Sequence, residues 1–354
     1  MPDARFKAVL RKLEGLLGAL DRPVTFMEVC GTHTAALFRS GLRALLPRGL
    51  RLLSGPGCPV CVTDQSEIHM ALDLAERGCL IVTYGDMMRV PGAKARSSLL
   101  ELKSRGARVE VTQSAMRAVE IARAEPGSQV VFLAVGFETT APATAAALKE
   151  AKRSSLTNFS ALCLHKTVPP VMRALCSRPG LDVDGFILPG NVTVVAGLDG
   201  YAFLPELGKA AAVAGFDPEE ILAALADLTQ QVTEGRFRLS AYRLRETPRA
   251  GNPMALRLMA EVFEPCDARW RGLGLIPRSG CRIREAYSCF DAAEKFGLTP
   301  VPTGDEGCKC GEILSGLMTP PECELHGTTC TPLTPVGPCM VSSEGACSAW
   351  YKWQ

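Results

Sequence analysis

The sequence predicts an α/β protein, with two parallel-sheet α/β domains followed by a mainly helical and loop domain. Three observations lead to this fold class. Short apolar runs alternate with helical patterns from residue 23 to about 240, which is typical of βαβ units. After residue 298 the periodicity fades, and Gly and Pro become frequent. Six of the 15 cysteines lie between Cys308 and Cys347, in a segment with too little apolar surface to form a core alone.

The apolar runs predict the strands, and the segments between them have helical spacing. We expect strands at 24–29, 51–55, 79–85, 108–113, 129–135, 159–165, 184–190 and 210–215. We expect helices at 34–46, 65–77, 96–106, 114–123, 142–152, 168–176, 252–262 and 282–297, and one that opens at Asp217.

Pro126 and Gly127 interrupt this alternation just before a strong new strand, so we place a domain boundary there. The predicted units are an N-terminal helix at 1–22, α/β domains at 23–126 and 127–240, and a C-terminal domain at 241–354. We expect the N-terminal helix to pack on the C-terminal domain.

Composition narrows the class of protein. A net charge of +2 argues against a nucleic-acid-binding footprint and against an electrostatic membrane anchor. No apolar run approaches the ~20 residues that span a bilayer, and residues 1–22 form an amphipathic pattern rather than a signal peptide. We therefore expect a cytoplasmic protein with reduced thiols, in which some cysteines bind metal or carry redox chemistry.

The C-terminal cysteines give the strongest chemical signal: Cys308, Cys310, Cys323, Cys330, Cys339 and Cys347. One C-x-C is followed by wide spacings, whereas zinc ribbons usually show two close pairs. This pattern favours a [4Fe–4S] cluster held by loops, with structural zinc or no metal as alternatives. Cys308 and Cys310 are too close to be equally placed, so one of them is not expected to be a ligand.

Two shorter cysteine motifs lie near the N-terminus. In GPGCPVC, Cys58 and Cys61 fit a redox-active dithiol, or else half of a metal site or a structural turn. In EVCGTHT, Cys30 follows a strand and precedes a helix whose N-terminus can favour a thiolate. His33 is a candidate base, ligand or hydrogen-bond donor, and ordinary packing is the alternative for this pair.

Two polar loops follow predicted strands. GFETTAP places Glu138, Thr139 and Thr140 after one strand, and YGDMMRVPG places Asp86 and Arg89 after another. Both suit ligand contact, although helix capping and turns would use the same residues. The chain has neither a P-loop motif nor a G-x-G-x-x-G motif after a strand, so neither nucleotide fingerprint is supported.

These motifs, together with GCKCGEILSG and CTPLTPVGPCMVSSEGAC, resemble the HypD family of hydrogenase maturation factors over roughly residues 23–353. One departure is PGNVT, where Asn191 stands in place of the family's usual histidine.

The resemblance implies two related α/β domains and a [4Fe–4S] domain. It implies a scaffold that, with the small chaperone HypC, builds the Fe(CN)2CO group of [NiFe]-hydrogenase, with cyanide from HypE–HypF. Cys30 would hold the iron, and Cys58 and Cys61 would form a thiol–disulfide site to which the cluster can pass electrons. His33 and Thr34 would orient or protonate groups at the iron. Glu138 would support this site or handle protons there. Our preferred cluster ligands are Cys310, Cys323, Cys330 and Cys347, with Cys308 and Cys339 as alternates.

Such a protein would be a maturation scaffold with redox activity rather than a free-standing metabolic enzyme. Two other classes of protein stay open. One is an iron–sulfur thiol–disulfide oxidoreductase that acts on a thioredoxin-like protein, and the other is a non-catalytic scaffold that contains structural zinc.

Overall fold

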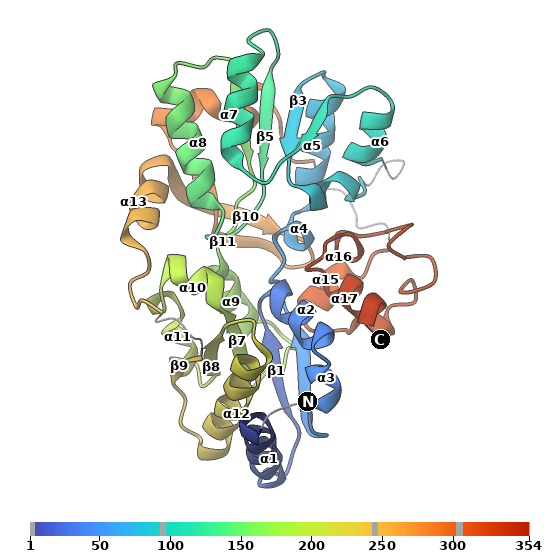
Figure 1. Ribbon diagram of the computed structural model, residues 1–354, viewed down its shortest axis with the longest axis vertical. Coiled ribbons are helices and arrows are strands. Elements are labelled where there is room, and N and C mark those ends of the chain that lie inside the picture. The colour runs from blue at the N-terminus through green and yellow to red at the C-terminus, as the bar shows by residue number, and fades with distance from the viewer. Residues whose placement is uncertain (1–3, 93–96, 243–246, 302–306, 354) are drawn as a thin grey trace.

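Figure 1 shows the computed structural model of the chain, which describes residues 4–92, 97–242, 247–301 and 307–353. Two parallel sheets form its two ends, and the predicted α/β class is confirmed. The first sheet has the order β2-β1-β7-β8-β9: β1 (Val24–Glu28), β2 (Leu50–Ser54), β7 (Gly185–Pro189), β8 (Ala210–Ala214) and β9 (Leu239–Tyr242). The second has the order β4-β3-β5-β6: β3 (Leu80–Thr83), β4 (Val109–Val111), β5 (Val130–Ala134) and β6 (Phe159–Cys163).

Helices cover these sheets and form the C-terminal region on the right of Figure 1. The α-helices are α1 (Ala4–Gly18), α2 (Gly31–Arg39), α3 (Leu42–Leu45), α4 (Pro59–Val62), α5 (Gln65–Glu76), α6 (Leu99–Ser104), α7 (Ala115–Ala124), α8 (Ala141–Arg153), α9 (Val168–Cys176), α10 (Gly190–Ala196), α11 (Phe203–Glu206), α12 (Pro218–Glu234), α13 (Pro253–Val262), α14 (Ala292–Lys295), α15 (Cys310–Leu314), α16 (Pro338–Val341) and α17 (Ala346–Trp353). The 3-10 turns are η1 (Gly85–Arg89), η2 (Asp199–Tyr201), η3 (Glu285–Phe290) and η4 (Pro320–Glu322). None of the helices in the described part of the chain is long and apolar enough to cross a bilayer.

The eight predicted strands are present as β1 to β8, but the prediction missed β9. The helix expected at 34–46 is divided into α2 and α3, because Gly41 adopts a left-handed conformation with φ 71°. Arg96, the first residue of another predicted helix, lies outside the described residues.

The domain boundary predicted at 126–127 is wrong, because it falls inside the second sheet. β3 pairs with β5 across that point, with Ile81 opposite Val131. The first sheet is also assembled from distant segments, since β1 pairs with β7 and Met27 lies opposite Phe186. Pro126 and Gly127 only end one helix before the next strand of the same sheet. Strands buried on both faces all read as similar apolar runs, so their pattern does not reveal their partners.

The N-terminal helix also packs elsewhere than expected. α1 lies against α12 rather than on the C-terminal domain. Phe6 and Leu13 are buried with Leu222 and Leu225 of that helix. The leucine spacing correctly indicated an amphipathic helix, but it carried no information about which apolar surface the helix would cover.

The helix predicted at 282–297 is wrong. A hairpin of β10 (Phe263–Trp270) and β11 (Gly274–Ile283) occupies its start, and η3 and α14 follow as separate short turns. Asp291 begins the second turn by accepting a hydrogen bond from Ala293 N at 2.8 Å. Cys266 lies opposite Gly280 and Ala268 opposite Ile276, so extra residues of β11 bulge out of the pairing and interrupt the alternation of that strand.

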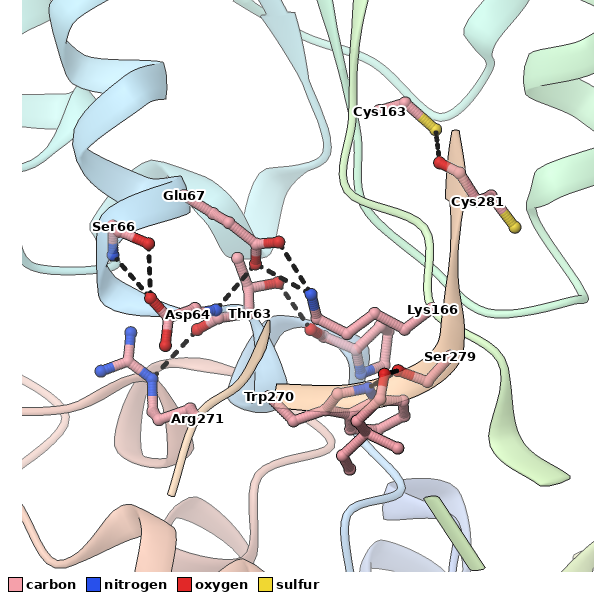
Figure 2. A network of polar contacts seen from close by, with 12 residues as sticks. Thr63, Asp64, Ser66, Glu67, Cys163, Lys166, Trp270, Arg271, Ser279 and Cys281 are labelled. Atoms are coloured by element: carbon pink, nitrogen blue, oxygen red, sulfur yellow. Dashed lines mark hydrogen bonds and ion pairs between the residues drawn. The ribbon is translucent and has the colours of Figure 1, made fainter. Parts of the chain in front are cut away.

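This hairpin connects the two sheets to α4. Figure 2 shows Lys166 Nζ donating to both carboxylate oxygens of Glu67, each at 2.9 Å. Trp270 Nε1 donates to Ser279 Oγ at 2.8 Å within the hairpin, and Arg271 Nε donates to Thr63 O at 3.1 Å, just after α4. Because these side chains are largely buried, the network gives α4 a fixed place between the sheets.

Candidate thiol site

The carboxyl ends of both parallel sheets face one cleft of about 460 Å³. Ligands of parallel α/β sheets bind at this end of the strands. From the first sheet, Cys30 follows β1 and Asn191 follows β7, while Asp86 and Thr140 follow β3 and β5 of the second. The C-terminal segment 342–344 lines another side. The cleft is therefore built from both sheets and the C-terminal segment.

Cys30 lies between β1 and α2, with only 4% of its surface exposed. Burial, and after it the charge of Glu344, raise the pKa of its thiol to about 12. The backbone N–H groups of Thr32 and His33 lower that pKa but are outweighed. The expectation that the helix N-terminus would favour a thiolate is thus overridden by burial. The sulfur ionises only when a cation takes the place of its proton.

The GPGCPVC motif lies directly against Cys30. Cys58 and Cys61 form a disulfide with Cα atoms 5.2 Å apart, and Cys58 caps the first turn of α4. Gly31 N donates to Gly57 O at 3.1 Å, and a Cβ on Gly57 would collide with the backbone of Cys30. Only glycine permits this approach, so the motif holds the disulfide beside the cleft.

His33 and Thr34 do not line the cleft in the described structure. His33 Nε2 is 2.8 Å from the carbonyl oxygen of Gly215, so it donates there, and burial lowers the pKa of this imidazole to about 4. Thr34 Oγ1 donates to Glu28 Oε1 at 2.8 Å. Both side chains are turned into the protein and support the turn that carries Cys30.

Glu28 is a buried carboxyl that the sequence reasoning overlooked. It is completely buried at the end of β1, and its Oε1 also accepts from Ser54 Oγ at 2.7 Å. Burial raises the pKa of Glu28 to about 8. An acidic residue inside an apolar strand, two positions before Cys30, was the available signal.

Glu138 is also buried rather than presented to the cleft, with 4% exposure. Its Oε1 accepts from Val168 N, the first residue of α9, at 2.9 Å. Its Oε2 has no hydrogen-bond partner among the described residues. Burial raises the pKa of this carboxyl to about 7. Thr139 and Thr140, from the same predicted motif, do line the cleft.

The C-terminal segment is bound to the cleft by polar contacts. Asp86 accepts from Ser342 Oγ at 2.7 Å and from Ser343 N at 3.1 Å. Thr32 Oγ1 donates to Glu344 Oε1 at 2.7 Å, beside Cys30. Asp86 therefore connects the second sheet to this segment, while Arg89 donates farther away, to Pro332 O.

The six C-terminal cysteines all line one small hollow. Cys310 and Cys339 form a disulfide with Cα atoms 6.3 Å apart. A sulfur in a disulfide cannot at the same time bind a metal as a thiolate, so this pairing argues against Cys310 as a ligand, and the preferred set stays a prediction. The other four cysteines of the hollow are Cys308, Cys323, Cys330 and Cys347.

These four cysteines influence one another electrostatically. Burial raises the pKa of Cys347, and negative charge on Cys308, Cys330 or Cys323 raises it further. Cys330 Sγ accepts from Val336 N at 3.4 Å. Ionisation of all four thiols in one hollow would require a cation to offset the repulsion between the thiolates. No group of three or more metal-binding side chains in the described ranges already has metal-binding geometry.

The two disulfides lie in adjacent elements. α15 carries Cys310 and α16 carries Cys339, and both helices pack against α4, which carries Cys61. The structure thus brings together the cysteine groups at 30, 58–61 and 308–347, which are far apart in the sequence.

The fold and the site define an α/β protein in which a buried cysteine, two disulfides and a hollow lined by six cysteines are packed together. The chain belongs to the HypD family: residues 4–354 match its model, which is described as the hydrogenase formation hypA family. It is 42% identical to hydrogenase maturation factor HypD of Rhodobacter capsulatus, over 98% of this chain and 94% of that protein. The HypD proteins of Azotobacter vinelandii and Escherichia coli K12 are 44% and 42% identical, each over 94% of this chain and 90% of the relative.

Proposed function

We propose that this protein acts in hydrogenase maturation as the scaffold on which the Fe(CN)2CO group is assembled, together with a HypC-type chaperone. The observation that carries the proposal is the position of Cys30, between the ends of both sheets and against the Cys58–Cys61 disulfide. HypE and HypF would deliver cyanide to this cleft in transient contacts. Family membership and the relatives' names support the process, and the site supports the division of roles among the cysteines.

Cys30 is the proposed protein ligand of the substrate iron. A thiolate is a soft donor, which suits iron that carries cyanide and carbon monoxide. In the absence of iron, burial keeps this thiol protonated. Binding of iron would release that proton into the cleft, where Asn191 and Thr140 supply polar side chains.

We assign Cys308, Cys323, Cys330 and Cys347 as the cluster ligands. They are the cysteines of the hollow that remain after Cys310 and Cys339 have paired, and four thiolates match what a [4Fe–4S] cluster requires. Val336 N donates a hydrogen bond to Cys330 Sγ, and hydrogen bonds to cluster sulfurs shift the reduction potential of a cluster. When bound, the cluster supplies electrons one at a time.

The two disulfides are the proposed path for reducing equivalents. Reduction of Cys310–Cys339 takes up two electrons and two protons and breaks its S–S bond. The resulting dithiol can reduce Cys58–Cys61 by thiol–disulfide exchange, which forms one S–S bond as the other breaks. The packing of α15 and α16 on α4 supports this order.

Anaerobic purification tests the cluster assignment. Separate replacement of Cys308, Cys323, Cys330 and Cys347 by Ser should each remove the broad visible absorption and lower the iron content. Cys310→Ser and Cys339→Ser are matched controls from the same hollow and should retain both. A colourless zinc protein, or loss of the cluster in the two control variants, would overturn the assignment.

Infrared spectroscopy of the protein co-purified with its chaperone tests the iron site. Cyanide and carbon monoxide bands should be present in the native protein and absent in Cys30→Ala. Cys79→Ala, another buried cysteine in the core, should retain them. Equal loss in both variants would refute the site, and a native protein that lacks these bands but reduces a thioredoxin-like partner would favour the oxidoreductase alternative.

A further inference from the structure

The C-terminal segment that carries Cys347 also forms part of the wall around Cys30. Gly31, the residue after Cys30, lies so close to Glu344 that a Cβ on this glycine would be 2.2 Å from Glu344 O and 2.6 Å from Glu344 Cβ. Thr32 Oγ1 donates a hydrogen bond to Glu344 Oε1 at 2.7 Å. Both residues that follow Cys30 are therefore in contact with Glu344, which itself lines the cleft.

The same segment reaches the hollow of cysteines three residues later. α17 begins at Ala346 and carries Cys347, which is buried and lines the hollow. α17 packs against α2, the helix whose N-cap is Cys30 (Figure 1). The ring centroids of Trp350 in α17 and Phe38 in α2 are 5.1 Å apart. The helix that follows Cys30 is thus in contact with this segment at both of its ends.

The order of this segment depends on its cysteines. α17 has eight residues, which is too few for a helix to be stable by itself in water. The helical elements described between 307 and 345 are α15, η4 and α16, of three to five residues each. When a metal site is not preformed in the unfolded chain, the free energy of metal binding contributes to folding. Loading of the hollow would therefore also hold α17 and Glu344 in place.

We propose that Glu344 is a positioning residue for Cys30, through which the cysteines of the hollow, once they hold their cluster, set the shape of the iron site. In the loaded protein Cys347 fixes the start of α17, and the Glu344 carboxylate holds Thr32 and the turn that carries Cys30. In the cluster-free protein the segment is tied less firmly and opens more often, so the wall of the cleft is complete for less of the time.

This coupling has a consequence for assembly. Iron would be held firmly only by a protein that already has the means to supply electrons. Because coupling between two sites is reciprocal, the contacts of Glu344 would also favour retention of the cluster. The inference rests on the proposed function, from which it takes the cluster in the hollow and the iron at Cys30.

Three variants separate this role from general stability. Glu344→Ala removes the acceptor of the Thr32 hydroxyl, whereas Glu344→Gln keeps an acceptor oxygen and should behave as the native protein does. Glu125→Ala is a matched control that also removes a carboxylate acceptor of a hydroxyl. Glu125 Oε2 accepts from Ser128 Oγ at 3.0 Å, at the end of α7 and away from the residues of the cleft.

Amide hydrogen exchange measured by mass spectrometry gives a readout that needs no iron. In the native protein, exchange at 30–35 and at 342–349 should be slower in the cluster-loaded form than after removal of the cluster by a chelator. Cys308→Ser, which changes a proposed ligand outside α17, should show the cluster-free pattern in both segments. In loaded Glu344→Ala, exchange at 30–35 should be about tenfold faster than in the loaded native protein, since loss of one hydrogen bond typically has an effect of this order.

Titration with Fe²⁺ measures the consequence at the iron site. Iron should bind about tenfold more weakly to the cluster-free native protein and to loaded Glu344→Ala, as is typical when an outer partner of a metal ligand is lost. Glu344→Gln and Glu125→Ala should retain native exchange and iron binding.

The comparison of loaded and cluster-free native protein decides the inference even where Glu344→Ala does not fold. Exchange at 30–35 that is the same in these two forms, that is unchanged in Glu344→Ala, or that rises equally in Glu125→Ala overturns the inference and leaves the proposed function standing. A native protein that holds no cluster overturns both.

Discussion

Gly57→Ala offers the sharpest test of the contact between the CPVC disulfide and Cys30. A Cβ at this position would lie closer than 3.0 Å to the backbone of Val29 and Cys30, a separation that real Cβ atoms essentially never show. The Cβ would lie 2.2 Å from Cys30 N and ordinary contacts begin at 3.4 Å, so the two segments must move apart by about 1.2 Å (3.4 − 2.2). The obstacle is backbone rather than a flexible side chain, so the strain cannot be relieved by a rotamer change.

Two effects set the size of the loss. Overpacking of a close-packed site typically destabilises by about 1–3 kcal/mol. Separation of the segments also weakens the hydrogen bond from Gly31 N to Gly57 O, now 3.1 Å, and a bond of this kind contributes about 0.5–1.5 kcal/mol. We therefore expect Gly57→Ala to lower the free energy of unfolding by about 3 kcal/mol.

Urea unfolding followed by circular dichroism measures this change. The midpoint should fall at an unchanged m value, which indicates a loss of stability rather than a change in the unfolded state. Gly127→Ala is the control, because a Cβ there meets nothing within 4 Å. It should leave stability unchanged or raise it by about 0.4–1 kcal/mol. If Gly57→Ala and Gly127→Ala unfold at the same midpoint, Gly57 does not pack against the backbone of Cys30 in solution.

Three further changes test the polar interior. Burial raises the pKa of Glu28 from 4.5 to about 8, so between these values the folded state binds a proton that the unfolded state has lost, and the free energy of unfolding falls as pH rises. The urea midpoint of Glu28→Gln should therefore rise relative to that of the native protein from about pH 5 to pH 8. Parallel pH curves for the two proteins would contradict this. Glu67→Gln and Lys166→Met each break the buried ion pair and should each lower the stability of the protein by about 3–5 kcal/mol in thermal melts. The double variant should lose less stability than the sum of the two single variants. Additive losses would show that the buried pair is not coupled. Asp86→Ala should speed amide hydrogen exchange around Ser342, and unchanged exchange would mean that these hydrogen bonds do not hold the segment.

The local fold could be predicted from the sequence much better than its assembly. Apolar runs identified the buried strands, and Asp217 followed by Pro218 marked the start of α12. The boundary at 126–127 failed because strand pairing depends on contacts between distant segments, such as Met27 with Phe186. The β10–β11 hairpin was missed for a different reason, since the extra residues between Ile276 and Gly280 interrupt the alternation of β11.

The site, like the fold, could be predicted from the sequence only in its local parts. The residue types and motifs indicated Cys30, the Cys58–Cys61 pair and a group of six cysteines, and the structure brings these groups together. The inward orientation of His33 could not be predicted, because its partner is the carbonyl of Gly215, 182 residues away. Spacing alone could not choose between Cys308 and Cys310, because it does not reveal that Cys310 pairs with a cysteine 29 positions later.

The glycines beside the cysteines explain how three separate segments can place their sulfur atoms so close together. Gly31 lets Glu344 pass over the turn that carries Cys30, and Gly57 lets the CPVC loop meet that same turn. Gly311 receives the tip of the hairpin at Gly272, and Gly337 leaves room for the Cys308 sulfur. At Gly31, Gly57 and Gly337 a Cβ would overlap another part of the thiol site, and at Gly311 it would overlap the hairpin. The glycines in CG, GPGC, CG and GPC are therefore as much a part of this site as the cysteines, because they permit the close approach of the segments that carry them.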